Sequence, residues 1–369
     1  MSAVNEAEST RCSARHSIAL IPGDGIGTEV VPAALEVLDP LMSRHGIQVE
    51  WVEYAWGSEY YRTNGRMMAE DGLDQLAQHD AIFFGAVGAP GIPDDLTLWG
   101  LLIPMRRTFE QYVNLRPVRH VPGVPSPLKD PEGIDLIIVR ENVEGEYSQV
   151  GGRYGVGEAE TAVQEAVFTR SGVTRIAAYA ADLARGRRGE LTSATKSNGI
   201  IHTMPFWDEV VADVVARTPG VKLRSVLIDA LAAALVLRPQ QFDVIVASNL
   251  FGDILSDLAA GCIGSIGLAA SANINPERKH PSMFEPVHGS APDIAGRGWA
   301  NPLAQMATAS LMLDHLGHPD AAAELTAAVD GVLRHGPRTR DLGGTATTKD
   351  VTTAVLDHLT NSTPSGSPR

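Results

Sequence analysis

The chain has 369 residues, of which 44% are hydrophobic, so it can bury a large core and divide into two domains. Its formal net charge of −14 disfavours nucleic acid and anionic membranes as partners, and an anionic substrate would need a local cluster of arginines. The sequence has no apolar run close to the ~20 residues that span a bilayer, and residues 1–16 lack the apolar core of a signal peptide. A cytoplasmic location is therefore expected.

The ends of the chain, residues 1–16 and 361–369, are polar, and we predict that both are disordered tails. The two cysteines, Cys12 and Cys262, are too few for a disulfide framework and cannot form a zinc site alone.

The first folded segment is an apolar strand, Ile18–Pro22, followed by Gly23-Asp-Gly-Ile-Gly27 and an amphipathic helix. These glycines alternate as G-x-G-x-G, whereas the dinucleotide-binding fingerprint is G-x-G-x-x-G. We therefore predict a tight strand-to-helix turn, with a ligand-lining loop as the alternative. Strands at 48–54 and 81–85 alternate with helical segments, which predicts βαβ units and a mainly parallel α/β sheet.

Three arginines, Arg106, Arg116 and Arg140, lie at or near the ends of apolar segments. Each guanidinium group can bind a carboxylate through two parallel hydrogen bonds, so three that converge would suit a dicarboxylic acid. Taken alone, each arginine is more typical of a solvated surface.

The middle of the chain is predicted to contain an irregular hairpin, from residues 145–157 and 161–168. Farther along, Lys196 ends a short strand and Asp229 stands where a strand gives way to a helix. That edge is where open α/β sheets bind ligands. Lys196 is a candidate base if burial or nearby charge tunes its pKa; a solvated lysine is the alternative.

Two aspartates follow the most apolar strand, which we predict at 242–247. From about Gly252 the apolar residues recur at helical spacing, so Asp253 and Asp257, four residues apart, share one face of a helix. A hard cation such as Mg²⁺ or Mn²⁺ would relieve their repulsion. The alternative is a solvated acidic helix start, facing the positive end of the helix dipole.

A compact polar loop covers residues 284–294. Backbone amides near Gly289 and Ser290 could bind phosphate, and Asp293 could accept hydrogen bonds from a ribose diol. A carboxylate at that point would repel a 2′-phosphate, which favours NAD over NADP. An ordinary loop stabilised by its prolines is the alternative.

Taken together, these segments resemble the β-decarboxylating dehydrogenases, the family of isocitrate, 3-isopropylmalate and D-malate or tartrate dehydrogenases. The resemblance extends from Ile18 to about Leu359. It rests on four motifs: Asn249-Leu-Phe-Gly-Asp-Ile-Leu-Ser-Asp257, Asn114-Leu-Arg-Pro117, Val139-Arg-Glu-Asn142 and Glu285-Pro-Val-His-Gly-Ser-Ala-Pro-Asp293.

The resemblance implies the site and its cofactors, which are NAD, Mg²⁺ or Mn²⁺ and, as often in such enzymes, K⁺, whose ligands are not placed. Asp229, Asp253 and Asp257 would hold the metal, and Lys196 and Tyr147 would be the acid/base pair. The three arginines would hold the substrate carboxylates. Asp229 and Lys196 would complete the site of the partner subunit in a homodimer. The expected NAD-binding residues are His288, Gly289, Ser290, Ala291, Asp293, Ile294 and Asn301.

The implied fold has two domains and is not the standard Rossmann fold. The large, NAD-binding domain would comprise residues 17–111 and 264–360. Residues 112–263 would form the small domain, with a dimer clasp at about 145–170.

Within the family, the D-malate and tartrate dehydrogenases are the most similar, because the run Ser193-Ala-Thr-Lys-Ser-Asn198 differs from those around the lysine of the isopropylmalate and isocitrate enzymes. We expect Trp99 to fill the space that larger substrates use and to leave room for a four-carbon 2-hydroxy diacid, and Leu102 to be a further substrate-binding residue. The alternatives are a 3-isopropylmalate dehydrogenase, a non-catalytic regulatory subunit of an isocitrate dehydrogenase-like complex and a metal-dependent hydrolase.

Overall fold

The computed structural model describes residues 15–361, so most of the two predicted tails, residues 1–14 and 362–369, lies outside the described residues. The part of the first tail that is described does not agree with the prediction. Arg15 and His16 begin a strand, because they pair in parallel with Gln48 and Val49 and Arg15 also forms an ion pair with Glu50.

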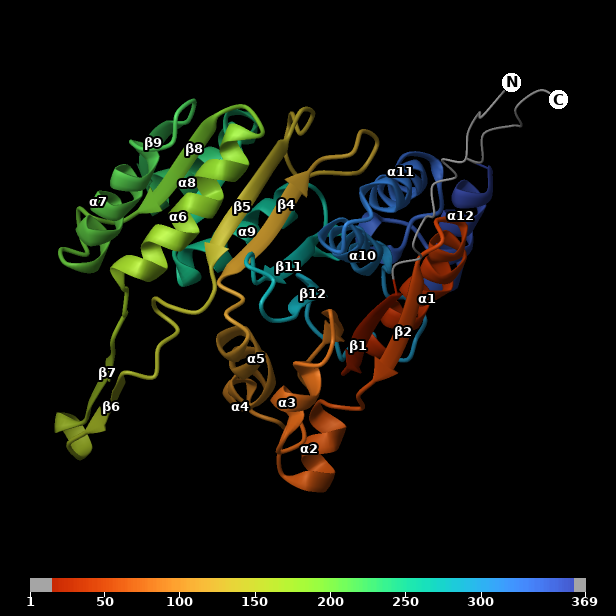
Figure 1. Ribbon diagram of the computed structural model, residues 1–369, viewed down its shortest axis with the longest axis horizontal. Helices are drawn as coiled ribbons and strands as arrows, with labels where there is room; N and C mark the ends of the chain where they lie inside the picture. Colours follow the sequence, from red (N-terminus) through yellow and green to blue (C-terminus); the bar gives the residue numbers. More distant parts are fainter. Residues whose placement is uncertain (1–14, 362–369) are drawn as a thin grey trace, which may run out of the picture.

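One ten-stranded sheet runs through the described chain (Figure 1). Its strands, in spatial order, are β2 (Gln48–Glu53), β1 (Arg15–Gly23), β3 (Ala81–Ala86), β12 (Ser282–Pro286), β11 (Ala270–Ile274), β4 (Val113–Arg119), β5 (Asp135–Glu141), β10 (Val244–Ala247), β8 (Glu190–Thr195) and β9 (Lys222–Leu227). Strand β11 is antiparallel to β12 and β4, and β4 is antiparallel to β5, while the other neighbouring pairs are parallel. The prediction of a mainly parallel α/β sheet is confirmed.

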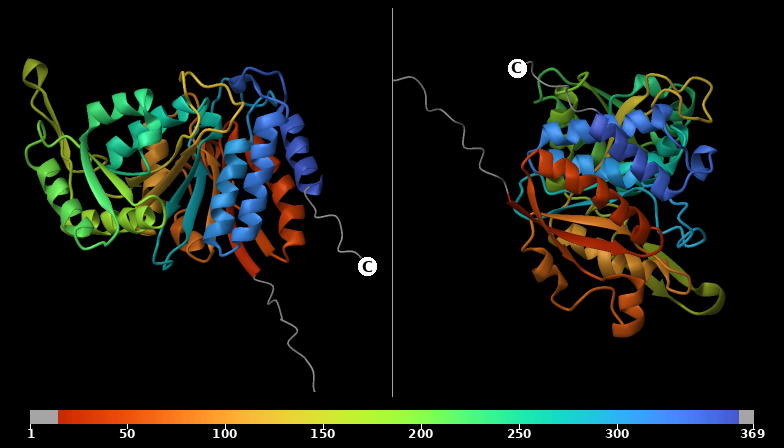
Figure 2. Two further views of the ribbon diagram at one scale, coloured as in Figure 1. Left: turned by 90° about the horizontal axis from the view of Figure 1, so that it is seen from above. Right: turned by 90° about the vertical axis from the view of Figure 1, so that its right-hand side faces the viewer.

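Helices cover the sheet. They are α1 (Gly27–Arg44), α2 (Ser58–Asn64), α3 (Gly72–Leu76), α4 (Asp94–Thr97), a π-helix (Leu98–Leu102), α5 (Ile103–Thr108), α6 (Arg170–Arg185), α7 (Thr203–Val215), α8 (Ile228–Leu237), α9 (Asn249–Cys262), α10 (Leu303–His315), α11 (Pro319–His335) and α12 (Thr348–Asn361). Figure 2 shows α1, α10, α11 and α12 grouped together at the end of the sheet that holds β1 and β2. In the described part of the chain, no helix is both long and apolar enough to cross a bilayer.

Strand β1 separates two cores, because successive side chains of a strand point to opposite faces. Ile18 and Leu20 belong to the larger core, which also contains the buried face of α1. Ala19 and Ile21 belong to a smaller core with residues of the π-helix and α5. A nearly continuous apolar run is what a strand covered on both faces requires, and on one of these faces the cover includes α5.

The strand order follows the predicted division of the chain. Strands β2, β1, β3, β12 and β11 come largely from residues 17–111 and 264–360, and the other five come from residues 112–263. The two sets meet at the pairing of β11 with β4. The division into two domains stays a prediction, which this order supports.

The predicted hairpin consists of β6 (Gly151–Tyr154) and β7 (Thr161–Gln164), which pair in antiparallel fashion and project away from the sheet (Figure 1). Its exposed apolar side chains include Val150 and Val156. Its predicted role as a clasp between subunits is not tested by a single chain.

Helix α9 begins at Asn249, three residues before the predicted start. The reason is tertiary: Glu146, from the segment before the hairpin, accepts hydrogen bonds from the Leu250 amide (3.0 Å) and the Ser248 hydroxyl (2.7 Å). A carboxylate distant in the sequence therefore satisfies one of the free amides at the helix start and binds the hydroxyl of the residue before it.

Candidate active site

The two aspartates of α9 lie on one face of the helix, as predicted. Because the helix starts at Asn249, Asp253 and Asp257 come after its first turn, which contains no acidic residue, and the interpretation as an acidic helix start is wrong. Their side chains are 34% and 55% exposed, so both carboxylates are accessible to a ligand.

Gly252 brings α9 against β5. A Cβ atom at this position would lie 2.6 Å from the Cβ and Cγ atoms of Arg140, closer than real Cβ contacts. Only glycine therefore allows this helix to pack directly on the arginine, which places the carboxylate of Asp253 at its guanidinium group.

The structure brings the three predicted arginines together from three elements, since Arg106 lies in α5, Arg116 in β4 and Arg140 near the end of β5. All three are buried. Arg140 makes a close ion pair with Asp253, and Nη1 of Arg116 lies 3.4 Å from Asp253 and 3.3 Å from Asp257.

The charged groups of this cluster shift one another's pKa values. Burial, together with the neighbouring Arg116, lowers the pKa of Arg140. Burial alone would raise the pKa of Asp253, but Arg140 and Arg116 outweigh it and the pKa is lowered. For Asp257 the balance is opposite, because burial, aided by the charge of Asp253, raises its pKa in spite of Arg116. A second positive charge on the open side of the aspartates would stabilise both ionised carboxylates.

Two of the arginines keep a free donor. The Nε atoms of Arg106 and Arg116 are buried and have no hydrogen-bond partner among the described residues. Burying an unpaired N–H is costly, so such donors point to an acceptor that the protein itself does not supply. An anionic ligand with carboxylates would satisfy them.

Arg106 is held by a buried network that sequence analysis did not identify. Glu285 accepts a hydrogen bond from Nη2 of Arg106 and another from Nδ2 of Asn273, both at 2.7 Å. The Oδ1 atom of Asn273 in turn accepts from Asn114 (3.1 Å) and Asn142 (2.8 Å). Glu285, Asn114 and Asn142 belong to the motifs used above, but Asn273 lies in none of them, and no local pattern marks it.

Tyr147 contacts the same group. Its hydroxyl donates to Oδ2 of Asp253 at 3.0 Å, and the guanidinium carbon of Arg140 lies 5.6 Å from the centre of its ring. Burial, reinforced by the charge of Asp253, raises the pKa of Tyr147, so the phenol keeps its proton at neutral pH.

Lys196 and Asp229 form a separate pair. Lys196 follows β8, Asp229 is the second residue of α8, and Nζ lies 2.9 Å from Oδ1. This hydrogen bond lowers the pKa of Asp229, whose side chain is 65% exposed. Within residues 15–361 of one chain, no three His, Cys, Asp or Glu side chains are grouped so that they could hold a metal. The two accessible carboxylates of Asp253 and Asp257 suit a hard cation. They leave further coordination positions for water, substrate or a residue from a second copy of the chain.

Trp99 and Leu102 lie in the π-helix before α5. Leu102 is buried in the smaller core, whereas Trp99 is half-buried and lies under the guanidinium group of Arg107, 4.9 Å from its carbon to the ring centre. π-Helical turns are rare and occur frequently at functional sites. The sequence did not predict this one.

A pocket of about 360 Å³ lies next to the 284–294 loop. Of the residues predicted to bind NAD, His288, Ala291, Ile294 and Asn301 line it, while Gly289, Ser290 and Asp293 do not. Sequence analysis missed several lining residues, which are Ile26, Ser265, Ile266, Gly267, Trp299, Arg340 and Asp341.

The glycine turn of residues 23–27 supports this pocket. The Ile26 amide donates to the carbonyl oxygen of Ser290 at 2.8 Å. Gly25 has φ +56°, and a Cβ atom there would lie 2.0 Å from that carbonyl oxygen. The turn is thus tight, as predicted, and it also contributes Ile26 to the pocket. Its alternative role in lining a ligand stays a prediction.

His288, in the lining of this pocket, has the hydrogen-bonding capacity that a nucleotide base would use. Nε2 of His288 is buried and has no partner among residues 15–361, and Nδ1 lies 3.0 Å from the Gly289 carbonyl oxygen. Burial lowers the pKa of His288, so the ring is neutral, and with Nδ1 donating, Nε2 is an acceptor. An amino group such as that of adenine would pair with it.

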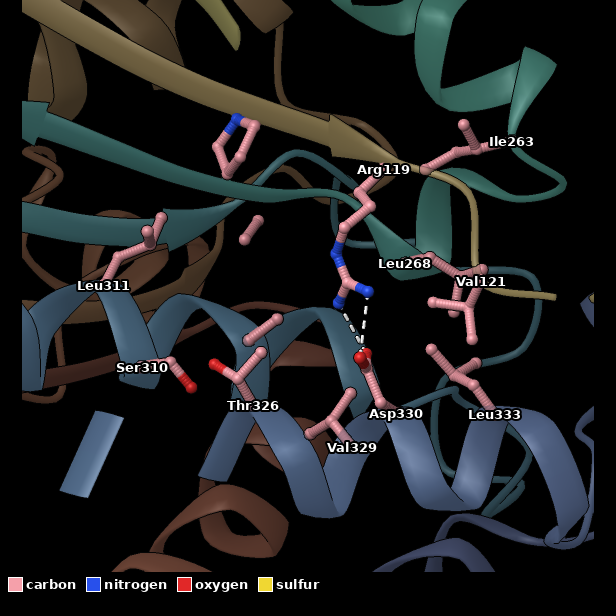
Figure 3. A pocket seen from close by; sticks show the side chains of 13 residues that line it. Arg119, Val121, Ile263, Leu268, Ser310, Leu311, Thr326, Val329, Asp330 and Leu333 are labelled. Atoms are coloured by element: carbon pink, nitrogen blue, oxygen red, sulfur yellow. Dashed lines mark hydrogen bonds and ion pairs between the residues drawn. The ribbon is translucent and has the colours of Figure 1, made fainter. Parts of the chain in front are cut away.

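A second cavity, of about 230 Å³, is not part of this site (Figure 3). It is lined mainly by apolar side chains at the end of β4 and on α10 and α11. The charges that line it, Arg119 and Asp330, already pair through two hydrogen bonds of 2.5 and 2.8 Å. This pair connects the predicted small domain to the predicted large one.

Comparisons with known proteins agree with the resemblance. Residues 17–355 match the model of the isocitrate/isopropylmalate dehydrogenase family. The "Probable tartrate dehydrogenase/decarboxylase" of Bacillus subtilis is 52% identical over 344 residues, which cover 93% of this chain and 97% of that protein. The "D-malate dehydrogenase [decarboxylating]" of Escherichia coli is 52% identical over 349 residues, 92% of this chain and 97% of that protein.

Among solved structures, the isocitrate dehydrogenase of Methylococcus capsulatus superimposes with a TM-score of 0.85 at 36% identity, and the match covers 93% of this chain and 99% of that one. The predicted fold class is confirmed.

Proposed function

The chain belongs to the isocitrate/isopropylmalate dehydrogenase family, and on this premise we propose that it catalyses the NAD-dependent oxidative decarboxylation of D-malate to pyruvate and CO₂, with Mg²⁺ or Mn²⁺, and that it also acts on tartrate. The names of the two relatives at 52% identity support the decarboxylating dehydrogenase activity and the choice of substrates.

One observation carries the proposal: three buried guanidinium groups are clustered, those of Arg116 and Arg140 contact two accessible carboxylates of α9, and those of Arg106 and Arg116 keep an unpaired buried N–H. A small diacid would take the arginines, and a divalent cation would take Asp253 and Asp257. Arg116 and Arg140 would then exchange their aspartate partners for the substrate, and the aspartates would exchange the arginines for the cation. This preserves charge balance in a buried site.

When bound, NAD⁺ would accept the hydride from C2, and the divalent ion would stabilise negative charge on the C2 oxygen. Arg106, Arg116 and Arg140 would hold the substrate carboxylates and orient the C2–H bond. Lys196 would take the proton of the C2 hydroxyl. After the C4 carboxylate leaves as CO₂, Tyr147 would return a proton to C3, and its raised pKa keeps it protonated for this step.

We further propose a homodimer in which Lys196 and Asp229 complete the site of the partner. Asp229 is exposed and not grouped with Asp253 and Asp257 within residues 15–361 of one chain. Helix α8 consists almost entirely of apolar residues, yet Val236 and Leu237 are 44% and 73% exposed. Ile254 on the adjacent α9 is 54% exposed. An apolar helix pair left open to water favours contact with a second copy.

The observation that favours a small substrate over 3-isopropylmalate is Trp99, whose ring would fill the space of a larger side group. A non-catalytic regulatory subunit is disfavoured, because all the predicted acidic, basic and arginine side chains are present. A hydrolase would leave the pocket beside the 284–294 loop without a role.

One assay tests the proposal. The protein is stripped of metal, resupplied with Mn²⁺ and followed for NADH formation with D-malate, L-tartrate, 3-isopropylmalate and isocitrate in parallel. We expect metal-dependent NADH formation that is fastest with D-malate or tartrate. No reduction of NAD⁺ by any of the four would contradict a dehydrogenase, and preference for 3-isopropylmalate would support the second candidate.

A further inference from the structure

Arg107, which follows Arg106 in α5, contacts two residues of the proposed site without being part of it. Its Nη2 atom donates to the main-chain carbonyl oxygen of Tyr147 at 2.7 Å. Its guanidinium carbon lies 4.9 Å from the centre of the Trp99 ring. Among these contacts, the hydrogen bond connects the predicted large domain with the predicted small one.

The π-helix explains how Trp99 and Arg107 meet. In a regular α-helix residues i and i+7 share a face, whereas i and i+8 are turned by about 80° from each other. A π-helical turn contains about one residue more than an α-helical turn. The insertion at Leu98–Leu102 therefore rotates Trp99 onto the face of Arg107, and the long arginine side chain reaches back toward it.

Arg107 is not a solvated surface arginine. Its side chain is half-buried, and burial lowers its pKa. A guanidinium group on an aromatic face gains a cation–π attraction, and a hydrogen bond from a charged donor is stronger than a neutral one. The two contacts use different parts of the guanidinium group, because one requires its flat face and the other a single N–H.

Tyr147 is thereby held at three points. Its hydroxyl donates to Asp253, its ring lies near Arg140, and its carbonyl oxygen accepts from Arg107. Asp253 and Arg140 would change partners when ligands bind, but Arg107 would not.

We propose that Arg107 is a positioning residue that holds both the pocket wall formed by Trp99 and the proton donor Tyr147, and so couples the selection of substrate size to the return of the proton. This inference rests on the proposed function, since it assigns no chemistry of its own to Arg107.

The test compares Arg107→Lys and Arg107→Met in the full-length protein with saturating Mn²⁺ and NAD⁺. Lysine keeps a charged donor for the Tyr147 carbonyl oxygen but lacks the flat face, and methionine lacks both. The measurements are kcat and KM for D-malate, the solvent deuterium isotope effect on kcat, and the inhibition constant of 3-isopropylmalate against D-malate.

For Arg107→Met we expect kcat to fall about tenfold or more, KM to change by less than about threefold, and the isotope effect to rise, because misplaced acids slow proton transfer. Arg107→Lys should recover most of kcat. In both variants 3-isopropylmalate should bind about fivefold more tightly, because Trp99 loses the planar guanidinium group that stacks on its ring.

The controls separate this role from a structural one. Arg224→Met removes a similar guanidinium group above Phe242, 5.2 Å from its ring, and should change none of these values. In a Trp99→Leu background, Arg107→Lys should no longer affect 3-isopropylmalate binding. Equal losses of affinity for D-malate and 3-isopropylmalate at an unchanged isotope effect, or additive effects of the Trp99 and Arg107 substitutions, would overturn the inference.

If Arg107→Met does not fold, the inference is still tested by Arg107→Lys, through its effect on 3-isopropylmalate binding with and without Trp99→Leu. A wild-type protein that is inactive with D-malate refutes the proposed function instead, so the two failures are distinguishable.

Discussion

Glu141, directly after Arg140, makes the stability of the protein depend on pH. This residue is only 1% exposed, and the burial raises its pKa to about 7 although the amides of Val143 and Glu144 donate hydrogen bonds to Oε1 at 2.9 and 3.1 Å. Its other oxygen, Oε2, has no partner in the described part of the chain. The native protein therefore keeps this proton at pH values where an ordinary glutamate has lost it.

Proton binding determines whether stability rises or falls with pH. Between the ordinary pKa of 4.5 and the native value of about 7, the native state holds more protons than the unfolded chain. The free energy of unfolding must then fall as the pH rises through this window, and it falls no further above it. The difference between the two pKa values corresponds to a loss of roughly 3 kcal/mol.

The perturbation is Glu141→Gln, which keeps the volume and the Oε1 acceptor but cannot ionise. Between about pH 5 and about pH 8 we expect the wild type to lose roughly 3 kcal/mol of unfolding free energy relative to this variant. Urea denaturation at steps across this range measures it.

Glu158→Gln, on the exposed hairpin, is the matched control and should leave the pH profile of the wild type unchanged. If the curves of the wild type and Glu141→Gln run parallel across the range, the carboxyl group does not titrate in this window and the reasoning is wrong.

Three further substitutions test the site. Glu285→Gln removes the charge partner of the buried Arg106 and should lower the free energy of unfolding by ~3 kcal/mol in urea titrations; an unchanged midpoint would contradict a stabilising pair. Gly25→Ala places a Cβ atom 2.0 Å from the Ser290 carbonyl oxygen and should raise KM for NAD⁺ about tenfold while sparing KM for D-malate. A uniform loss of activity would argue against a local effect on the pocket. Asp257→Asn should raise the Mn²⁺ concentration for half-maximal activity by about tenfold or more, as measured by titration of the metal-free enzyme. An unaltered titration would exclude Asp257 as a ligand.

The arginines show where sequence analysis sufficed and where it did not. Residue type and position indicated only that Arg106, Arg116 and Arg140 would suit a dicarboxylic acid if they converged, and the family resemblance implied a shared role; in the structure they lie in one buried cluster. Their internal partners could not be predicted, because Asp253, Glu285 and Asn249 are brought to them by the packing of α9 and β12.

The 284–294 loop shows a similar limit. The loop lies beside a pocket, but two residues predicted to bind NAD do not line it: the carbonyl oxygen of Ser290 accepts from the Ile26 amide, and Asp293 is exposed. Trp299 and Arg340, which no motif marked, do line it. Which side of a loop faces a cavity depends on what the loop packs against, here the glycine turn at residues 23–27.

The sequence by itself determined the family, the mainly parallel α/β architecture and the residue types that make the chemistry, because hydrophobic period and local motifs act over a few residues. Only the tertiary structure decided the start of α9, which a distant Glu146 caps, the π-helical turn that directs Trp99 toward Arg107, and the raised pKa of Glu141. These features depend on burial and on partners far apart in the chain. The local pattern of residues predicts neither the burial nor the partners.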